Sequence, residues 1–122
     1  MFFPVSGWFA AFLVTLAVEI PIAAFLLRGA GLDRLRLIVL IVFANLATHP
    51  AVWYVFTQLF LVGTPGYTLA AEAWAISTEA VFYWAAIRGL PVRRAVAVAV
   101  AANAVSFIVG RLVGEFWPEL FT

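Results

Sequence analysis

Residues 37–61 read LIVLIVFANLATHPAVWYVFTQLFL, and no Asp, Glu, Lys or Arg interrupts these 25 positions. About 20 apolar residues are enough for an α-helix to cross the hydrocarbon core of a bilayer. This stretch therefore predicts a membrane-spanning helix with length to spare for a tilt or a kink. We expect the kink at Pro50, because proline lacks a backbone N–H and clashes with the preceding helical turn.

The composition of the whole chain supports the same prediction. Hydrophobic residues make up 66% of the 122 residues and charged residues 11%, and the mean hydropathy is +1.12. A small soluble domain has too little interior to bury so much apolar surface. We therefore expect one transmembrane domain over residues 1–122 in a cell (inner or plasma) membrane. Its first partner is the lipid bilayer, and no nucleic-acid-binding motif is present.

Several chemistries are excluded by residue types that the sequence lacks. The chain has no cysteine and no lysine, so it forms no disulfide, thiolate metal site or Schiff-base lysine. Its single histidine, His49, cannot build a multi-histidine metal site within one chain. A haem held by two histidines would require a dimer.

Three more apolar stretches, separated by turns rich in glycine and proline, complete the predicted architecture. The expected spans are 8–27, 37–61, 68–87 and 92–113, which gives an all-α polytopic membrane protein with an antiparallel four-helix bundle. The first and third turns hold six of the arginines: Arg28, Arg34, Arg36, Arg88, Arg93 and Arg94. The positive-inside rule places these turns in the cytoplasm and both termini outside. The arginines suit lipid headgroups, and docking of an acidic cytoplasmic partner is the alternative.

The two halves of the chain share a spaced set of polar residues. A glutamate lies nine residues before an Arg-Gly pair, an asparagine nine residues after the last arginine of the turn, and a hydroxyl three residues later. The matched pairs are Glu19 with Glu79, Asn45 with Asn103, and Thr48 with Ser106. We therefore predict two duplicated helical hairpins, about 8–61 and 68–113, related as a parallel repeat.

This spacing predicts a polar cluster near the middle of the membrane, because nine helical residues rise about 13 Å. Its members are Glu19, Asn45, Thr48, His49, Glu72, Glu79, Asn103 and Ser106. A charged carboxylate at the bilayer centre costs about 2.5–3.5 kcal/mol, so intramembrane glutamates are candidate functional groups. In one interpretation the cluster binds a cation or relays protons, with His49 and Glu72 as weak metal-ligand candidates. In the other, protonated glutamates bond to the asparagines and hold the helices together, at about 0.6–2 kcal/mol per pair.

Three classes of function remain open from the sequence. The first is a small channel or transporter for protons or a small cation, using the intramembrane Glu, His and Asn residues. The second is an accessory or structural subunit of a larger membrane complex, and the partners are then other membrane subunits or further copies of the chain. The third is a pigment, quinone or haem site at His49, with the cofactor unknown. An enzyme is least favoured, because neither Ser77 nor Ser106 has the sequence context of a nucleophile elbow.

Overall fold

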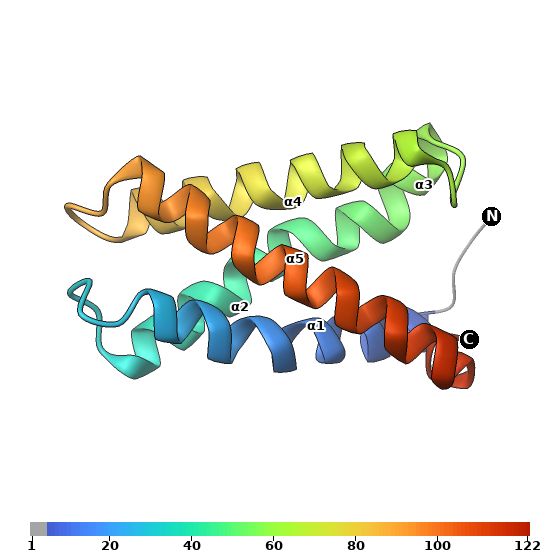
Figure 1. Ribbon diagram of the computed structural model, residues 1–122, viewed down its shortest axis with the longest axis horizontal. Helices are drawn as coiled ribbons and strands as arrows, with labels where there is room; N and C mark the ends of the chain where they lie inside the picture. The colour runs from blue at the N-terminus through green and yellow to red at the C-terminus, as the bar shows by residue number, and fades with distance from the viewer. Residues whose placement is uncertain (1–4) are drawn as a thin grey trace.

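The computed structural model describes residues 5–122, and within this range the chain forms helices and turns without strands (Figure 1). Four long rods form the bundle. They are α1 (Val5–Leu26), the composite second rod, α4 (Pro65–Ala86) and α5 (Val92–Phe116). The second rod consists of α2 (Arg34–Pro50), the π-helix η1 (Ala51–Val55) and α3 (Phe56–Leu59). A 3-10 turn, η2 (Pro118–Phe121), ends the chain. The all-α prediction is confirmed, and the number of rods agrees with the predicted four-helix bundle.

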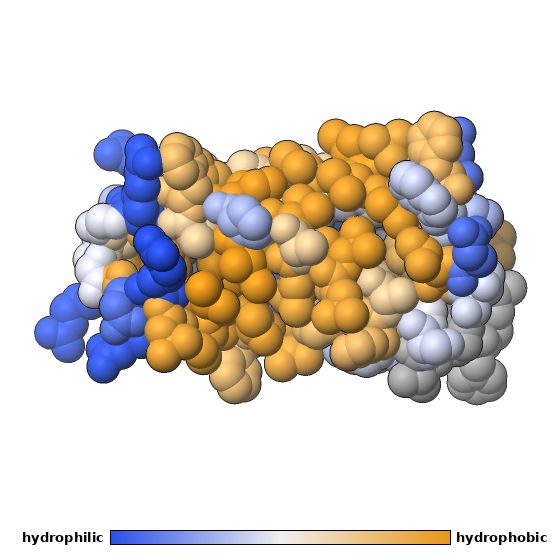
Figure 2. All heavy atoms as spheres, turned by 90° about the horizontal axis from the view of Figure 1, so that it is seen from below, coloured by the Kyte–Doolittle hydropathy of each residue, from blue (hydrophilic) through white to orange (hydrophobic). Residues whose placement is uncertain are grey.

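Three of the rods are long and apolar enough to cross a membrane: Ser6–Leu26, Arg34–Leu59 and Val92–Phe116. Helix α4 is comparably long at 22 residues but is less apolar, since Glu72 and Glu79 both lie within it. On the face that Figure 2 shows, apolar residues cover most of the middle, with polar residues toward the two ends. Within the described residues, the structure is therefore compatible with a membrane protein, and the crossing of α4 remains a prediction.

Each rod packs against two neighbours, in the cyclic order α1, α2, α4, α5. The α1–α2 turn and the α4–α5 turn lie at one end, which we name the arginine end (Figure 1). The start of α1, the α3–α4 turn and the C-terminus lie at the opposite end, named the C-terminal end (Figure 1). The prediction that the N-terminus lies outside the cytoplasm concerns residues 1–4, and these lie outside the described part of the chain.

Local sequence accounts for the turns at the arginine end. Helix α2 begins after Asp33, whose carboxylate accepts a 2.8 Å hydrogen bond from the backbone N–H of Arg36. Gly29 and Gly89, just past α1 and α4, have φ angles of 76° and 80°, a backbone region that glycine enters without a Cβ clash. Both Arg-Gly pairs thus mark the end of a helix.

Helix type changes at Pro50, where the sequence predicts a kink. Helix α2 ends at this residue, and the π-helical turn η1 follows it directly. Proline cannot donate a backbone hydrogen bond, and single π-helical turns are a known way to absorb such a defect. The hydroxyl of Tyr67 on α4 donates to the carbonyl of Val52 at 3.1 Å and ties η1 to the neighbouring rod.

Apolar side chains from all four rods close the arginine half of the bundle. We name this set the apolar plug: Ala23, Leu27, Leu37, Ile41, Ala44, Ala80, Tyr83, Ile87, Leu90, Ala95, Val98 and Ala99. Every member is buried. The polar cluster therefore has a packed apolar layer between it and the arginine turns.

Arg94 differs from the other arginines of the turns, because it joins the two turns to each other. Its guanidinium donates to the carbonyls of Leu26 at 2.9 Å and Arg28 at 3.1 Å, at the C-terminal end of α1. We expect Arg94→Gln to lower the free energy of unfolding by about 1 kcal/mol, since a cation bonded to helix-terminal carbonyls is favourable. Unfolding followed by circular dichroism in detergent measures this. The exposed neighbour Arg93 supplies the control, and an equal loss in Arg93→Gln would contradict the role of Arg94.

Candidate functional site

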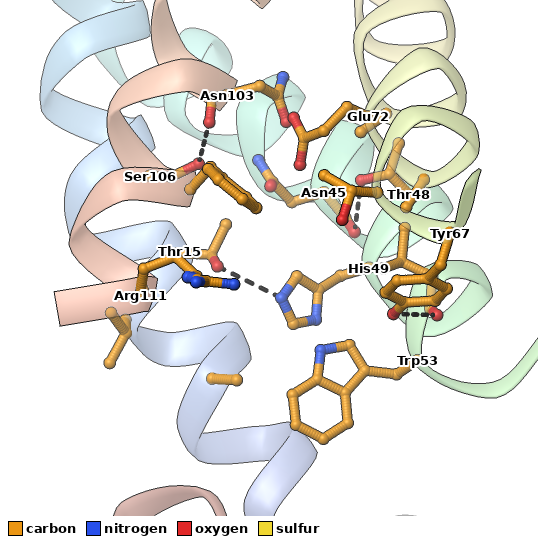
Figure 3. A pocket seen from close by; sticks show the side chains of 18 of the residues that line it. Thr15, Asn45, Thr48, His49, Trp53, Tyr67, Glu72, Asn103, Ser106 and Arg111 are labelled. Carbon is orange, nitrogen blue, oxygen red and sulfur yellow. Dashed lines mark hydrogen bonds between the residues drawn. The ribbon is translucent and has the colours of Figure 1, made fainter. Parts of the chain in front are cut away.

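A pocket of about 410 Å³ lies inside the bundle and collects the predicted polar cluster (Figure 3). Every member of the cluster except Glu79 lines it: Glu19, Asn45, Thr48, His49, Glu72, Asn103 and Ser106. The pocket extends to Gly63 in the α3–α4 turn and to Phe121 in η2, both at the C-terminal end. The apolar plug fills the other half of the bundle. The site is therefore one-sided, with a polar interior that extends toward the C-terminal end.

Glu79 lies just behind the pocket wall and is fully buried, with 0% of its surface exposed. The amide of Asn103 donates to its Oε2 atom, and the hydroxyl of Thr48 donates to its Oε1 atom at 3.3 Å. Both carboxyl oxygens therefore have a donor. The predicted Glu–Asn contact is present in the second hairpin, and the Thr48 contact connects the two hairpins.

Glu19 is equally buried, at 1% exposure, but only one of its oxygens has a donor. The hydroxyl of Ser106 donates to Oε1 at 2.7 Å. The Oε2 atom is buried and has no hydrogen-bond partner within residues 5–122. Asn45 and Glu79 lie beside this carboxyl. Glu19 is therefore less fully hydrogen-bonded than Glu79, and it is one of the residues that line the pocket.

The contacts of the two halves follow one pattern. Each asparagine donates to the carbonyl four residues earlier, at 3.0 Å for Asn45 and 2.8 Å for Asn103. Each hydroxyl lies 3.2 Å from the carbonyl of the asparagine three residues earlier and shares its single proton between that carbonyl and a glutamate. Each hydroxyl also reaches the glutamate of the other half, Thr48 to Glu79 and Ser106 to Glu19. The sequence matched these residues in pairs, but it did not predict that the hydroxyls connect the hairpins.

His49 lies farther toward the C-terminal end, among aromatic rings. Its Nε2 atom shares a 3.2 Å hydrogen bond with the hydroxyl of Thr15, and its Nδ1 atom is buried without a partner among the described residues. The ring centroids of Phe12 and Trp53 lie 5.5 Å and 6.2 Å from that of His49, and Trp8 lies at 6.4 Å. The spacing of residues 8, 12, 15 and 19 places them on one face of α1, a sequence signal that could have identified these neighbours of His49.

Two oppositely charged side chains lie on neighbouring walls of the same pocket. Glu72 on α4 is partly buried, and Arg111 on α5 is exposed. The guanidinium of Arg111 lies 5.9 Å from the ring of Phe107 and extends toward His49 (Figure 3). Arg111 lies outside the two arginine turns, and the sequence did not identify it as a site residue.

The predicted metal candidates, His49 and Glu72, both line the pocket. In the part of the chain that the structure describes, no group of three or more His, Cys, Asp or Glu side chains is placed to hold a metal ion. The donors that surround the two central glutamates are hydroxyls and amides. Hydroxyl and amide groups that donate in this way stabilise the carboxyl oxygens of the glutamates as hydrogen-bond acceptors.

Comparisons with protein-family models, with curated proteins and with solved structures gave no match for this chain. The side chains of the pocket offer the carboxyl of Glu19, the imidazole of His49, the acidic group of Glu72 and the guanidinium of Arg111, with the buried carboxyl of Glu79 behind them. These groups suit the binding and transfer of protons or charged solutes.

Proposed function

We propose that this protein is a small membrane transporter or channel for protons or a small cation, and that Glu19 takes up the ion. The observation that carries the proposal is the Oε2 atom of Glu19, which is buried, lacks a hydrogen-bond partner among the described residues and belongs to a residue of the pocket lining. Ionisable residues are costly inside a membrane, and those that persist there mark ion pathways and proton relays.

The order of the ionisable groups along the bundle supports proton transfer. Glu72 and His49 lie on the C-terminal side, Glu19 lies near the middle, and Glu79 lies behind the pocket wall. Glu19 and Glu79 are both buried in the interior of the bundle. In this scheme a proton enters through the pocket, binds the unpaired oxygen of Glu19 and moves to Glu79.

The apolar plug favours a transporter over a permanently open pore. Beyond Glu79, buried apolar residues from all four rods fill the space up to the arginine turns. An ion that leaves on that side therefore requires a rearrangement of the rods. Two similar hairpins that meet at the Thr48–Glu79 and Ser106–Glu19 contacts supply a means for this, because movement between repeats is a common transport mechanism.

The membrane orientation follows from the arginine turns, which lie together at one end of the bundle (Figure 1). The positive-inside rule assigns that end to the cytoplasm. The pocket then extends toward the outer face, and the C-terminus lies on that side. In this arrangement protons enter from outside.

Proton flux into liposomes tests the proposal. We expect the purified wild-type protein to acidify the lumen when a potassium diffusion potential drives protons inward, and a sodium gradient tests a small cation. The double variant His49→Ala, Glu72→Gln removes both outer ionisable groups of the pocket and should reduce the flux. Glu119→Gln, at an exposed position in η2, serves as the control.

Two outcomes would overturn the proposal. The first is a wild-type protein that conducts neither protons nor sodium in liposomes, and a stoichiometric partner or pigment in native purifications would then favour the accessory-subunit or cofactor alternative. The second is unchanged flux in the His49→Ala, Glu72→Gln variant, which would exclude the pocket as the entry route.

A further inference from the structure

The pocket places an acidic and a basic side chain at about the same level of the bundle. The bond from Asn103 to Glu79 aligns the antiparallel helices α4 and α5. Toward the C-terminal end, Glu72 lies seven residues beyond this contact and Arg111 lies eight residues beyond it. Both are therefore displaced by about 10–12 Å, at a rise of about 1.5 Å per residue. They line the pocket from two adjacent walls.

These two side chains do not form an ion pair within residues 5–122. The guanidinium of Arg111 reaches into the pocket toward His49 (Figure 3). Glu72 and Glu19 are the two carboxyl groups of the pocket lining. One wall therefore presents an acidic group and the adjacent wall a guanidinium, with the pocket between them.

The pocket that these two side chains line is larger than a proton or a small cation needs. Its volume of about 410 Å³ lies within the range of organic ligand sites, about 300–1,000 Å³. Large apolar and aromatic side chains line the same space, among them Trp53, Tyr67, Phe107 and Phe121. Such walls suit an apolar body, and separated opposite charges suit a ligand that carries both signs.

We propose that this pocket binds a small zwitterion, with an ammonium group beside Glu72, a carboxylate beside Arg111 and an apolar body against the aromatic walls. An arginine can hold a carboxylate through two parallel hydrogen bonds, and a carboxylate together with aromatic rings attracts an ammonium group. That this ligand is a transported substrate rests on the proposed function. That the pocket binds it does not depend on the proposed function.

A series of ligands with the same body tests the two charges separately. The probes are L-phenylalanine, phenethylamine, which lacks the carboxylate, and 3-phenylpropanoate, which lacks the ammonium group. A second series uses L-leucine, 3-methylbutylamine and 4-methylpentanoate. Calorimetric titration of the full chain in detergent measures the affinities. We expect a zwitterion to bind about tenfold or more tightly than either of its singly charged analogues, because each charged hydrogen bond is substantial.

Variants assign each charge to its residue. In Arg111→Gln, the zwitterion should lose its advantage over the amine and keep its advantage over the acid. Glu72→Gln should show the opposite pattern. The exposed Glu119→Gln should bind as the wild type does. A merely structural role would instead weaken all ligands of a series alike, and circular dichroism verifies that each variant is folded.

Three results would overturn the inference: no binding in either series, equal binding of the zwitterion and its analogues, or a uniform loss in both variants. Retention of phosphatidylethanolamine by the wild type and its loss in Arg111→Gln, without binding of the free probes, would assign the site to a lipid headgroup instead. Binding without proton or sodium flux would leave the zwitterion site standing and overturn the proposed function. Flux without binding would exclude only the zwitterion.

Discussion

Glu19→Gln is expected to reduce proton flux by about 100-fold or more, because a positioned proton-transfer group commonly contributes about that factor. Glutamine keeps the shape of the side chain and an oxygen that accepts from Ser106, but it neither binds nor releases a proton in the relevant range. The change therefore removes the chemistry of Glu19 while retaining its contact with α5. Proton flux into liposomes, normalised to the amount of folded protein, measures the effect.

The same variant separates the two interpretations of the polar cluster. If the glutamates serve only to hold the helices together, Glu19→Gln lowers stability and leaves the flux per folded molecule unchanged. If Glu19 takes up protons, the flux falls although the folded fraction is retained. Glu115→Gln, an exposed change near the end of α5, is the control for altered charge. Wild-type flux in Glu19→Gln would remove this residue from the proton pathway.

The largest loss of stability is expected for Glu79→Ala. The variant removes the acceptors of Asn103 and Thr48 at a site with 0% exposure and leaves a cavity. Both donors keep a backbone partner within their own helix, at 2.8 Å and 3.2 Å. We therefore expect a loss of about 2 kcal/mol, below the sum for two fully orphaned donors. Reversible unfolding in mixed micelles measures it.

Glu79→Gln and a double-mutant cycle provide the controls for this prediction. Glutamine retains one acceptor oxygen, so its loss should be smaller than that of Glu79→Ala. The cycle with Asn103→Ala should give a coupling energy of about 0.6–1.7 kcal/mol, the usual size for contacts between membrane helices. The exposed Glu115→Ala should stay within about 0.5 kcal/mol of wild type. A loss in Glu79→Ala no greater than in Glu115→Ala would contradict the role of the buried carboxyl.

Much of the site was predictable because helical spacing fixes height along a rod. Glu79 and Asn103 lie at matched distances from the arginine turn, and the structure brings them into contact. Spacing also indicates the face of a rod: Asn45, Thr48 and His49 stand at positions i, i+3 and i+4, which share one face of a helix. Each of these three side chains lines the pocket. The duplication of the hairpins remains a prediction, supported by the matched contacts of the two halves.

Other parts of the site depend on which rods are neighbours, and periodicity carries no information about that. The Ser106–Glu19 bond joins residues 87 positions apart and exists because α5 packs beside α1. Arg111 belongs to neither arginine turn, so the sequence did not connect it with the other polar residues. Only the packing of the bundle makes it line the same pocket as Glu72. Nothing in the sequence distinguishes Arg94 from the other arginines of the turns, and only the fold places its guanidinium at the end of α1.

The sequence by itself determined a helical, strongly apolar chain with four rods, six of its seven arginines at one end and its acidic and amide side chains at set heights. Rise per residue and hydrophobic burial are local properties, so composition and spacing are sufficient for these features. Only the tertiary structure shows that the apolar plug fills the arginine half of the bundle, whereas the other half contains a pocket. That division depends on how side chains from four different rods fill the space between them, which is a property of their packing.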